Sequence, residues 1–187
     1  MNPFPLNALG NTPVFHTQRL VLRPLKAEDA QEIYALRSDP ENFKYVDFTP
    51  YSDLARAERF IASALSDMSE NTIHFWAICL ADKDVLIGTI CLWQYSEQPN
   101  CAEFGYEIMK SYQGYGYAGE VMAEIIHFAF ESIRLHQLLA ITHRDNLPSL
   151  ALLNRHGFHP VGVMLDMDPT CGEAPEMMLY SLVSELM

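Results

Sequence analysis

The segment from residue 101 to residue 142 limits most strongly what this chain can fold into. A strand pattern at residues 101–109 is followed by a short loop, a long amphipathic helix pattern at residues 116–134 and a buried-type strand at residues 136–142. Two strands joined through a helix usually lie parallel in one sheet, connected by a right-handed crossover. The segment therefore predicts a mixed α/β fold.

The rest of the chain adds strands and helices around this unit, which we predict from the spacing of apolar residues. Residues 1–14 form an irregular lead-in, and the 187 residues fit a single domain, 1–187. Ser52 is the predicted cap of one helix and Asn146 the predicted cap of another. The further strands are expected at 17–25, 73–81, 85–95, 161–167 and 176–183, and the further helices at 27–37, 52–67 and 146–155.

The charge of the chain argues against a nucleic-acid partner. Twelve Lys and Arg stand against 24 Asp and Glu, a net charge of −12, whereas a phosphate-backbone binder needs a basic patch. An acidic protein is compatible with a cationic substrate such as an amine. An anionic cofactor would then have to be held largely by main-chain N–H groups.

Targeting and metal-binding patterns are missing from the sequence. The first ten residues do not resemble a signal peptide, and no apolar run approaches the ~20 residues that span a bilayer. The four cysteines form no CxxC pair and the histidines form no HxxxH pair. We expect a cytoplasmic protein with reduced thiols, no membrane partner and no metal.

The sharpest motif is Gln113-Gly114-Tyr115-Gly116-Tyr117-Ala118, between a strand and the long helix. Glycines let the main chain approach a ligand and direct several N–H groups at one point, and the helix adds its positive end. Such a loop suits a pyrophosphate, although a tight turn without a ligand is the alternative. The same residues match GxGxxG, the dinucleotide-binding fingerprint, but that site is excluded because the loop does not follow directly on its strand. A nucleotide-kinase phosphate loop is excluded because no Gly-Lys-Ser/Thr occurs.

Gln113-x-x-Gly116-x-Ala118 resembles the Q/R-x-x-G-x-G/A loop of the GNAT superfamily of N-acetyltransferases. Three more segments, in the same order, resemble its branch of ribosomal-protein-alanine N-terminal acetyltransferases, and together they cover roughly residues 15–165. These segments are Thr17–Leu25 with Asp29-Ala30, Ala102–Ile108, and Asn146-x-x-Ser149 with Leu152 through Gly157-Phe158. The chain departs from the branch at residues 168–174.

The resemblance implies a fold, a cofactor and an activity. The fold is a mixed α/β (α+β) one, with a mostly antiparallel sheet of about seven strands flanked by about four helices. Acetyl-CoA is the co-substrate, and an amine attacks its thioester directly. The acceptor implied by the branch is a protein N-terminal α-amine. A small polyamine-like or antibiotic-like amine is the alternative, as is a non-catalytic acyl-CoA-sensing module, and the oligomeric state stays open.

A carboxylate on the strand before the loop is the predicted base. Glu103 and Glu107 share one face of that strand by alternation, and partial burial would raise the pKa of either toward neutrality. We favour Glu103, acting through water; Glu107 and the absence of any side-chain base are the alternatives.

The remaining predicted roles concern coenzyme A. The resemblance assigns the main chain of Ile108 and Met109 to the oxyanion and the pantetheine arm, and Asn146 to the arm or to capping alone. Ser149 is predicted to serve the leaving thiolate, or only to satisfy the helix end. The diphosphate is expected on Gln113, Gly114, Tyr115, Gly116, Tyr117 and Ala118.

Overall fold

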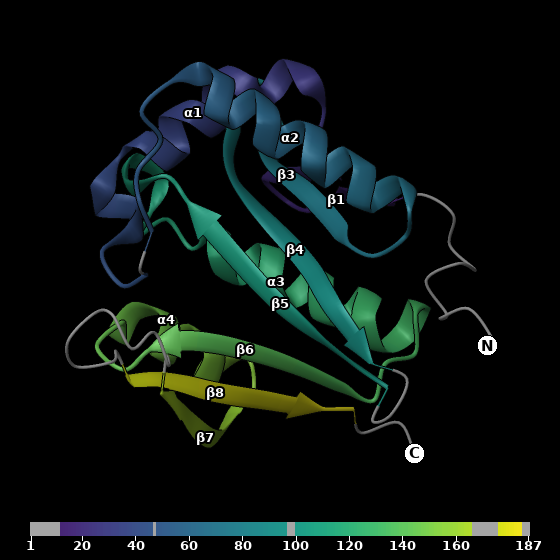
Figure 1. Cartoon of the computed structure of the whole chain (residues 1–187). Coiled ribbons are helices and arrows are strands. Elements are labelled where there is room, and N and C mark those ends of the chain that lie inside the picture. Colours follow the sequence, from purple (N-terminus) through teal and green to yellow (C-terminus); the bar gives the residue numbers. More distant parts are fainter. Residues whose placement is uncertain (1–11, 47, 97–99, 166–175, 185–187) are drawn as a thin grey trace.

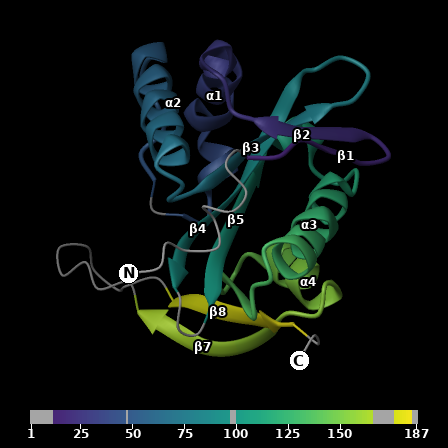
Figure 2. The same cartoon turned by 90° about the vertical axis from the view of Figure 1, so that its right-hand side faces the viewer.

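We describe the protein from a computed structural model, which covers residues 12–46, 48–96, 100–165 and 176–184. Within these ranges one eight-stranded sheet has helices on both faces (Figure 1). α1 and α2 cover one face, and α3 and α4 cover the other (Figure 2). The predicted mixed α/β fold is confirmed. The helices are α1 (Ala30–Ser38), α2 (Leu54–Ser69), α3 (Tyr117–His127) and α4 (Leu147–Arg155).

The strands lie in the order β1-β2-β3-β4-β5-β6-β8-β7. Every neighbouring pair is antiparallel except β5–β6, the parallel pair that the crossover through α3 predicted. The eighth strand arises because a two-residue strand, β1, pairs with the start of β2. The strands are β1 (Phe15–His16), β2 (Leu20–Pro24), β3 (His74–Leu80), β4 (Leu86–Ser96), β5 (Cys101–Ile108), β6 (Gln137–His143), β7 (His159–Leu165) and β8 (Glu176–Val183).

The core lies in two layers, one on each side of the sheet. Strand β3 shows this best because side chains on both of its faces are buried. Phe75 and Cys79 pack with α1 and α2, whereas Trp76 and Ile78 pack with α3 and α4. Because successive side chains of a strand alternate between faces, one central strand supplies both layers.

The predicted N-terminal cap of α4 is confirmed, whereas that of α2 is not. Asn146 caps α4, as its side-chain oxygen accepts a hydrogen bond from the Ser149 N–H (3.3 Å). The prediction of Ser52 as the cap of α2 is wrong. Asp53 accepts from the Arg56 N–H (3.0 Å), and the Ser52 hydroxyl donates to Asp53 (2.8 Å). A carboxylate is the favoured acceptor at a helix start because of the helix dipole.

Two helices have irregular ends. The helix expected at 27–37 begins as a 3₁₀ turn, Ala27–Asp29, before α1. The helix expected at 116–134 is α-helical only to His127 and continues as a π-helical turn, Phe128–Ser132. Apolar spacing does not distinguish such turns from α-helix, because it reports only which side is buried.

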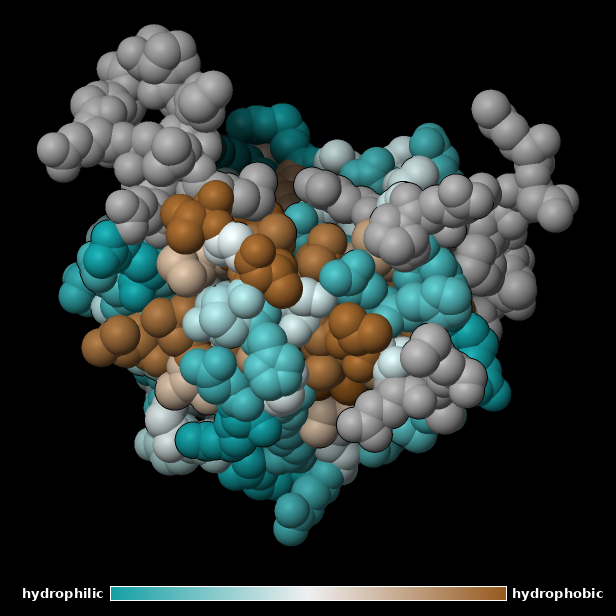
Figure 3. All heavy atoms as spheres, turned by 90° about the horizontal axis from the view of Figure 1, so that it is seen from below, coloured by the Kyte–Doolittle hydropathy of each residue, from teal (hydrophilic) through white to brown (hydrophobic). Residues whose placement is uncertain are grey.

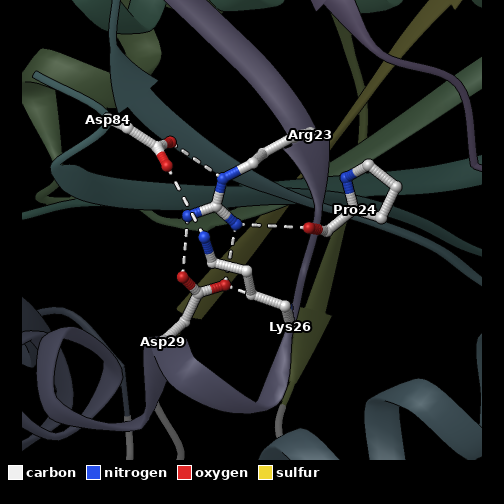
Figure 4. A network of polar contacts seen from close by, with 5 residues as sticks. All are labelled: Arg23, Pro24, Lys26, Asp29 and Asp84. Carbon is white, nitrogen blue, oxygen red and sulfur yellow. Dashed lines mark hydrogen bonds and ion pairs between the residues drawn. The ribbon is translucent and has the colours of Figure 1, made fainter.

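A polar network joins β2, the start of α1 and the β3–β4 turn (Figure 4). The Arg23 guanidinium donates to both carboxylate oxygens of Asp29 (2.7 and 2.9 Å) and to Asp84 (3.0 Å). Asp29 also accepts from the Lys26 N–H (2.9 Å). The Asp29 side chain is only 4% exposed, so this two-pronged pairing fixes α1 on the sheet.

The face of the molecule seen from below carries patches of apolar side chains (Figure 3). On the last strand pair, β7–β8, Val161, Val163 and Val183 are each more than half exposed. Residues 168–174, where the chain departs from the branch that it resembles, lie outside the described residues. Among the described ranges no helix is long and apolar enough to cross a membrane.

Candidate active site

The sheet opens between β5 and β6. Strand β5 pairs with β4 from Glu103 through Ile108, but its parallel pairing with β6 ends at Glu103, opposite Leu139. Both strands continue beyond this pair and diverge (Figure 1). An unpaired strand edge presents N–H and C=O groups that can bind another chain or a ligand. We call this divergence the β5–β6 split.

The main chain at the end of β5 turns toward this split at one residue and away from it at the next. The Met109 N–H donates to the Ile87 carbonyl on β4 (2.9 Å), and its own carbonyl accepts from Tyr112 (2.8 Å). Alternation in an antiparallel ladder therefore turns Ile108 the other way. The Gln113 side chain donates to the Ile108 carbonyl on that side (2.9 Å). Of the two predicted residues, Ile108 is the one that directs its amide at the split.

The glycine-rich loop leads from this strand end into α3. Gly114 and Gly116 have positive φ angles of 84° and 82°, a conformation that side chains other than glycine's rarely adopt. Gly116 begins α3 without a side-chain cap. The first N–H groups of a helix have no partner within it, and here these belong to Tyr117, Ala118 and Gly119. The loop thus presents main-chain donors and a positive helix end to an anion.

Glu103 stands at the last β5–β6 pair, opposite Trp93 of β4. Its side chain is half-buried, and burial raises the pKa of its carboxyl. Within the described ranges no cation pairs with it. A carboxylate in this environment binds a proton more readily than usual, as a general base working near neutrality must.

Glu107, four residues further on the same face, is held in a different way. Its Oε1 accepts from both Nε (3.0 Å) and Nη2 of Arg37 and from the Thr89 hydroxyl (2.9 Å). The side chains of Arg37 and Glu107 are each 15% exposed. The Arg37 guanidinium also lies 3.8 Å from the centre of the Phe60 ring. The Glu107 carboxylate thus forms an ion pair that holds α1 against β5.

Trp93 separates the two carboxylates. A Cβ atom added at Gly105, midway between Glu103 and Glu107, would lie 2.6 Å from the Trp93 ring. The indole therefore occupies the place of the missing side chain. Trp93 therefore lies beside Glu103, on the face covered by α1 and α2.

The opposite face of β5 carries a hydroxyl pair. The Tyr106 hydroxyl lies 3.2 Å from the Ser149 hydroxyl in the first turn of α4. Burial raises the pKa of Tyr106, while the hydrogen bond with Ser149 acts in the opposite direction. The Tyr106 hydroxyl therefore keeps its proton at neutral pH. No sequence pattern pointed to this tyrosine, because its partner is 43 residues away.

The connection between α1 and α2 reaches both strand ends at the split. The Asn42 side-chain oxygen accepts from the Lys110 N–H after β5 (2.9 Å). The Tyr45 ring stacks at 6.1 Å on His143, the last residue of β6. This connection thereby bounds the split on the side of Glu103.

Comparison with known proteins agrees with this architecture. The family model of the acetyltransferase (GNAT) domain matches residues 19–159, well over half of the chain. The chain belongs to the GNAT acetyltransferase family.

Individual relatives give the same answer. An uncharacterised N-acetyltransferase of Bacillus licheniformis, p20, is 31% identical over 169 residues, covering 90% of this chain and 94% of that relative. A solved Vibrio cholerae structure, whose suggested activity is ribosomal-protein-serine acetylation, has a TM-score of 0.79 at 26% identity over 92% of this chain and 98% of its own. Spermidine N-acetyltransferase from Vibrio cholerae, solved with CoA and spermine, has a TM-score of 0.76 at 21% identity over 88% and 95%. The chain is therefore an N-acetyltransferase.

GNAT enzymes use acetyl-CoA, and the described residues suit such a ligand. The start of α3 offers N–H groups without a partner in the helix to a diphosphate, and the split offers the open edge of β5 to an extended, amide-containing arm. No group of three or more His, Cys, Asp or Glu able to hold a metal occurs among the residues that the structure describes.

Proposed function

We propose that this GNAT enzyme transfers acetyl from acetyl-CoA to a protein N-terminal α-amine by direct attack. Glu103 removes the amine proton through a water molecule, and the new N–C bond forms as the C–S bond breaks. Ser149 donates a hydrogen bond or proton to the departing thiolate. The hydroxyl of Tyr106 is hydrogen-bonded to that of Ser149 and holds it in position. The Ile108 N–H faces the developing oxyanion.

The cofactor contacts follow from the same proposal. The diphosphate lies against the loop of Gln113, Gly114, Tyr115, Gly116, Tyr117 and Ala118. Asn146 caps α4 and in that position holds Ser149 beside Tyr106. Met109 lies beside the pantetheine arm but does not bind it through its N–H, because that N–H donates to the Ile87 carbonyl of β4.

The placement of Glu103 carries the proposal. Glu103 lies on the face covered by α1 and α2, whereas Tyr106 and Ser149 lie on the face covered by α3 and α4. In direct attack the amine approaches one side of the carbonyl carbon while the sulfur leaves from another. A base and an acid on opposite faces of the β5–β6 split match that requirement.

The walls of the acceptor side favour a protein N-terminus over a polyamine. Arg56 lies beside an aromatic ring of this region, with its guanidinium carbon 5.9 Å from the centre of the Phe48 ring. A polyamine brings several positive charges, which this arginine would repel, whereas a peptide end brings one amine. The Vibrio cholerae protein whose suggested activity is ribosomal-protein-serine acetylation supports the same acceptor. The free thiols of Cys79, Cys91 and Cys101 suit a cytoplasmic enzyme.

A thiol-release assay with acetyl-CoA tests this function. Peptides with a free Ser or Ala N-terminus should be acetylated with a kcat/KM at least about tenfold above that of spermidine. The same peptides with a blocked N-terminus and a free lysine are the matched control. Faster turnover of spermidine would replace the peptide acceptor with a small amine, and CoA binding without turnover of any amine would indicate a sensor.

A further inference from the structure

Arg19, next to the first residue of β2, contacts the glycine-rich loop almost a hundred residues later in the chain. Its Nη1 donates to the Tyr115 carbonyl (2.9 Å), and its guanidinium carbon lies 4.6 Å from the centre of the Tyr117 ring. A Cβ atom added at Gly116 would lie 3.6 Å from Nη2. One side chain thus lies along the length of the loop.

The same arginine is bound to Glu120 in the first turn of α3. Nε and Nη2 each lie 2.7 Å from Oε2 of Glu120. The Arg19 N–H and the Thr17 hydroxyl donate to Oε1 (2.8 and 2.6 Å). The Glu120 side chain is only 15% exposed. Exposed ion pairs contribute little, but here both carboxylate oxygens are bound and the guanidinium also holds a loop carbonyl.

The bond to the Tyr115 carbonyl orients the following amide. In a planar trans peptide the C=O of one residue and the N–H of the next point in opposite directions. Holding the Tyr115 oxygen against Arg19 therefore turns the Gly116 N–H to the other side of the loop. With glycine on both sides of Tyr115, this peptide plane would otherwise rotate readily.

The bond to Glu120 removes an electrostatic conflict. A carboxylate in the first turn stabilises a helix dipole, but it repels an anion bound at the same helix start. The charge of Arg19 cancels that of Glu120, so that the amides of Tyr117, Ala118 and Gly119 keep their attraction for phosphate.

We propose that Arg19 is a positioning residue for the acetyl-CoA diphosphate: it fixes the Tyr115–Gly116 peptide and neutralises Glu120. This inference rests on the proposed placement of the diphosphate on the loop. Arg19 acts on the affinity for the nucleotide part of the cofactor and not on the acetyl transfer itself.

The test is steady-state kinetics and calorimetry on the full chain. Arg19→Ala should raise the KM for acetyl-CoA and the Kd for CoA by about tenfold or more, with kcat at saturation within about twofold of wild type. The Kd for pantetheine, which lacks the diphosphate, should not change. Glu131→Ala, which breaks the exposed Glu131–Arg134 pair further along the same helical segment, is the control and should leave all constants unchanged.

A second substitution separates the two parts of the role. If charge cancellation matters, Glu120→Gln in the Arg19→Ala background should restore part of the affinity for CoA, a non-additive result. Arg19→Lys replaces the alanine variant if that does not fold, and it too should raise KM because one ammonium cannot hold both Glu120 and Tyr115. Equal KM values in wild type and both arginine variants would overturn the inference while leaving the enzyme's function intact. Failure of the wild type to bind CoA would instead remove the proposed function.

Discussion

The two edges of β5 differ, and the difference bears on where the proposed reactive groups lie. Toward β4 the ladder continues along the strand, from Glu103 to Ile108. Toward β6 it ends at Glu103. Further along β5, Glu107 is paired with Arg37 of α1 and Thr89 of β4. The carboxylate at the opening, Glu103, has no cationic partner among the described residues.

This comparison teaches that alternation alone does not distinguish a carboxylate held in an ion pair from one without a cationic partner. Glu103 and Glu107 share a strand, a face and a residue type, yet Arg37 and Thr89 bind Glu107, whereas Glu103 has no cationic partner among the described residues. A buried charge must be paired or must shift its pKa. Glu107 is paired with Arg37, whereas burial raises the pKa of the Glu103 carboxyl.

The largest expected effect is the loss of the ion pair between Glu107 and Arg37. Glu107→Ala leaves the Arg37 guanidinium without its carboxylate in a mostly buried site, and we expect the free energy of unfolding to fall by about 3 kcal/mol. Denaturant unfolding measures this change. Thr89→Val removes only one donor to the same carboxylate and should cost about 1 kcal/mol. A Glu107→Ala protein of normal stability but without turnover would reverse the roles of the two acids.

The second largest effect is expected at Glu103, where the pairing of β5 with β6 ends. Glu103→Gln should lower kcat about 10²-fold while stability stays near that of wild type. Because the base acts when deprotonated and burial raises the pKa of Glu103, wild-type kcat should rise with pH through that pKa. The rise belongs to Glu103 only if it disappears from the pH–rate profile of the glutamine variant.

The hydroxyl pair across the split should give graded effects. Ser149→Ala removes the donor to the thiolate and should lower kcat about 10²-fold, whereas Tyr106→Phe removes only its support and should lower kcat about tenfold. Rates with acetyl-CoA analogues that carry better leaving thiols measure the step directly. The assignment fails if such analogues are no less sensitive to Ser149→Ala than acetyl-CoA is.

The smallest expected effect is at the cap of α4. Asn146→Ala removes the acceptor for the Ser149 N–H and should lower stability by about 1 kcal/mol. Asn146→Asp keeps an acceptor and serves as the control. If both variants weaken CoA binding equally at unchanged stability, the asparagine contacts the pantetheine arm and does not merely cap.

Much of the fold was predictable because it depends on short-range patterns. The elements, the parallel β5–β6 pair and the left-handed glycines of the loop follow from periodicity, the crossover rule and the conformational freedom of glycine. The two-residue β1, the choice of Asp53 over Ser52 and the π-helical turn were not predictable. Each depends on a register or a hydrogen bond that leaves no periodic signal.

The sequence by itself determined the candidates for the proposed site: Glu103, Ser149 and the glycine loop between strand and helix. Only the tertiary structure decided what each of them meets. It paired Glu107 with an arginine 70 residues earlier, joined Tyr106 to Ser149 across 43 residues and bound Arg19 to Glu120 across 101. The physical reason is range: backbone preferences act within a few residues, whereas burial and charge pairing act between segments that meet only when the sheet has formed.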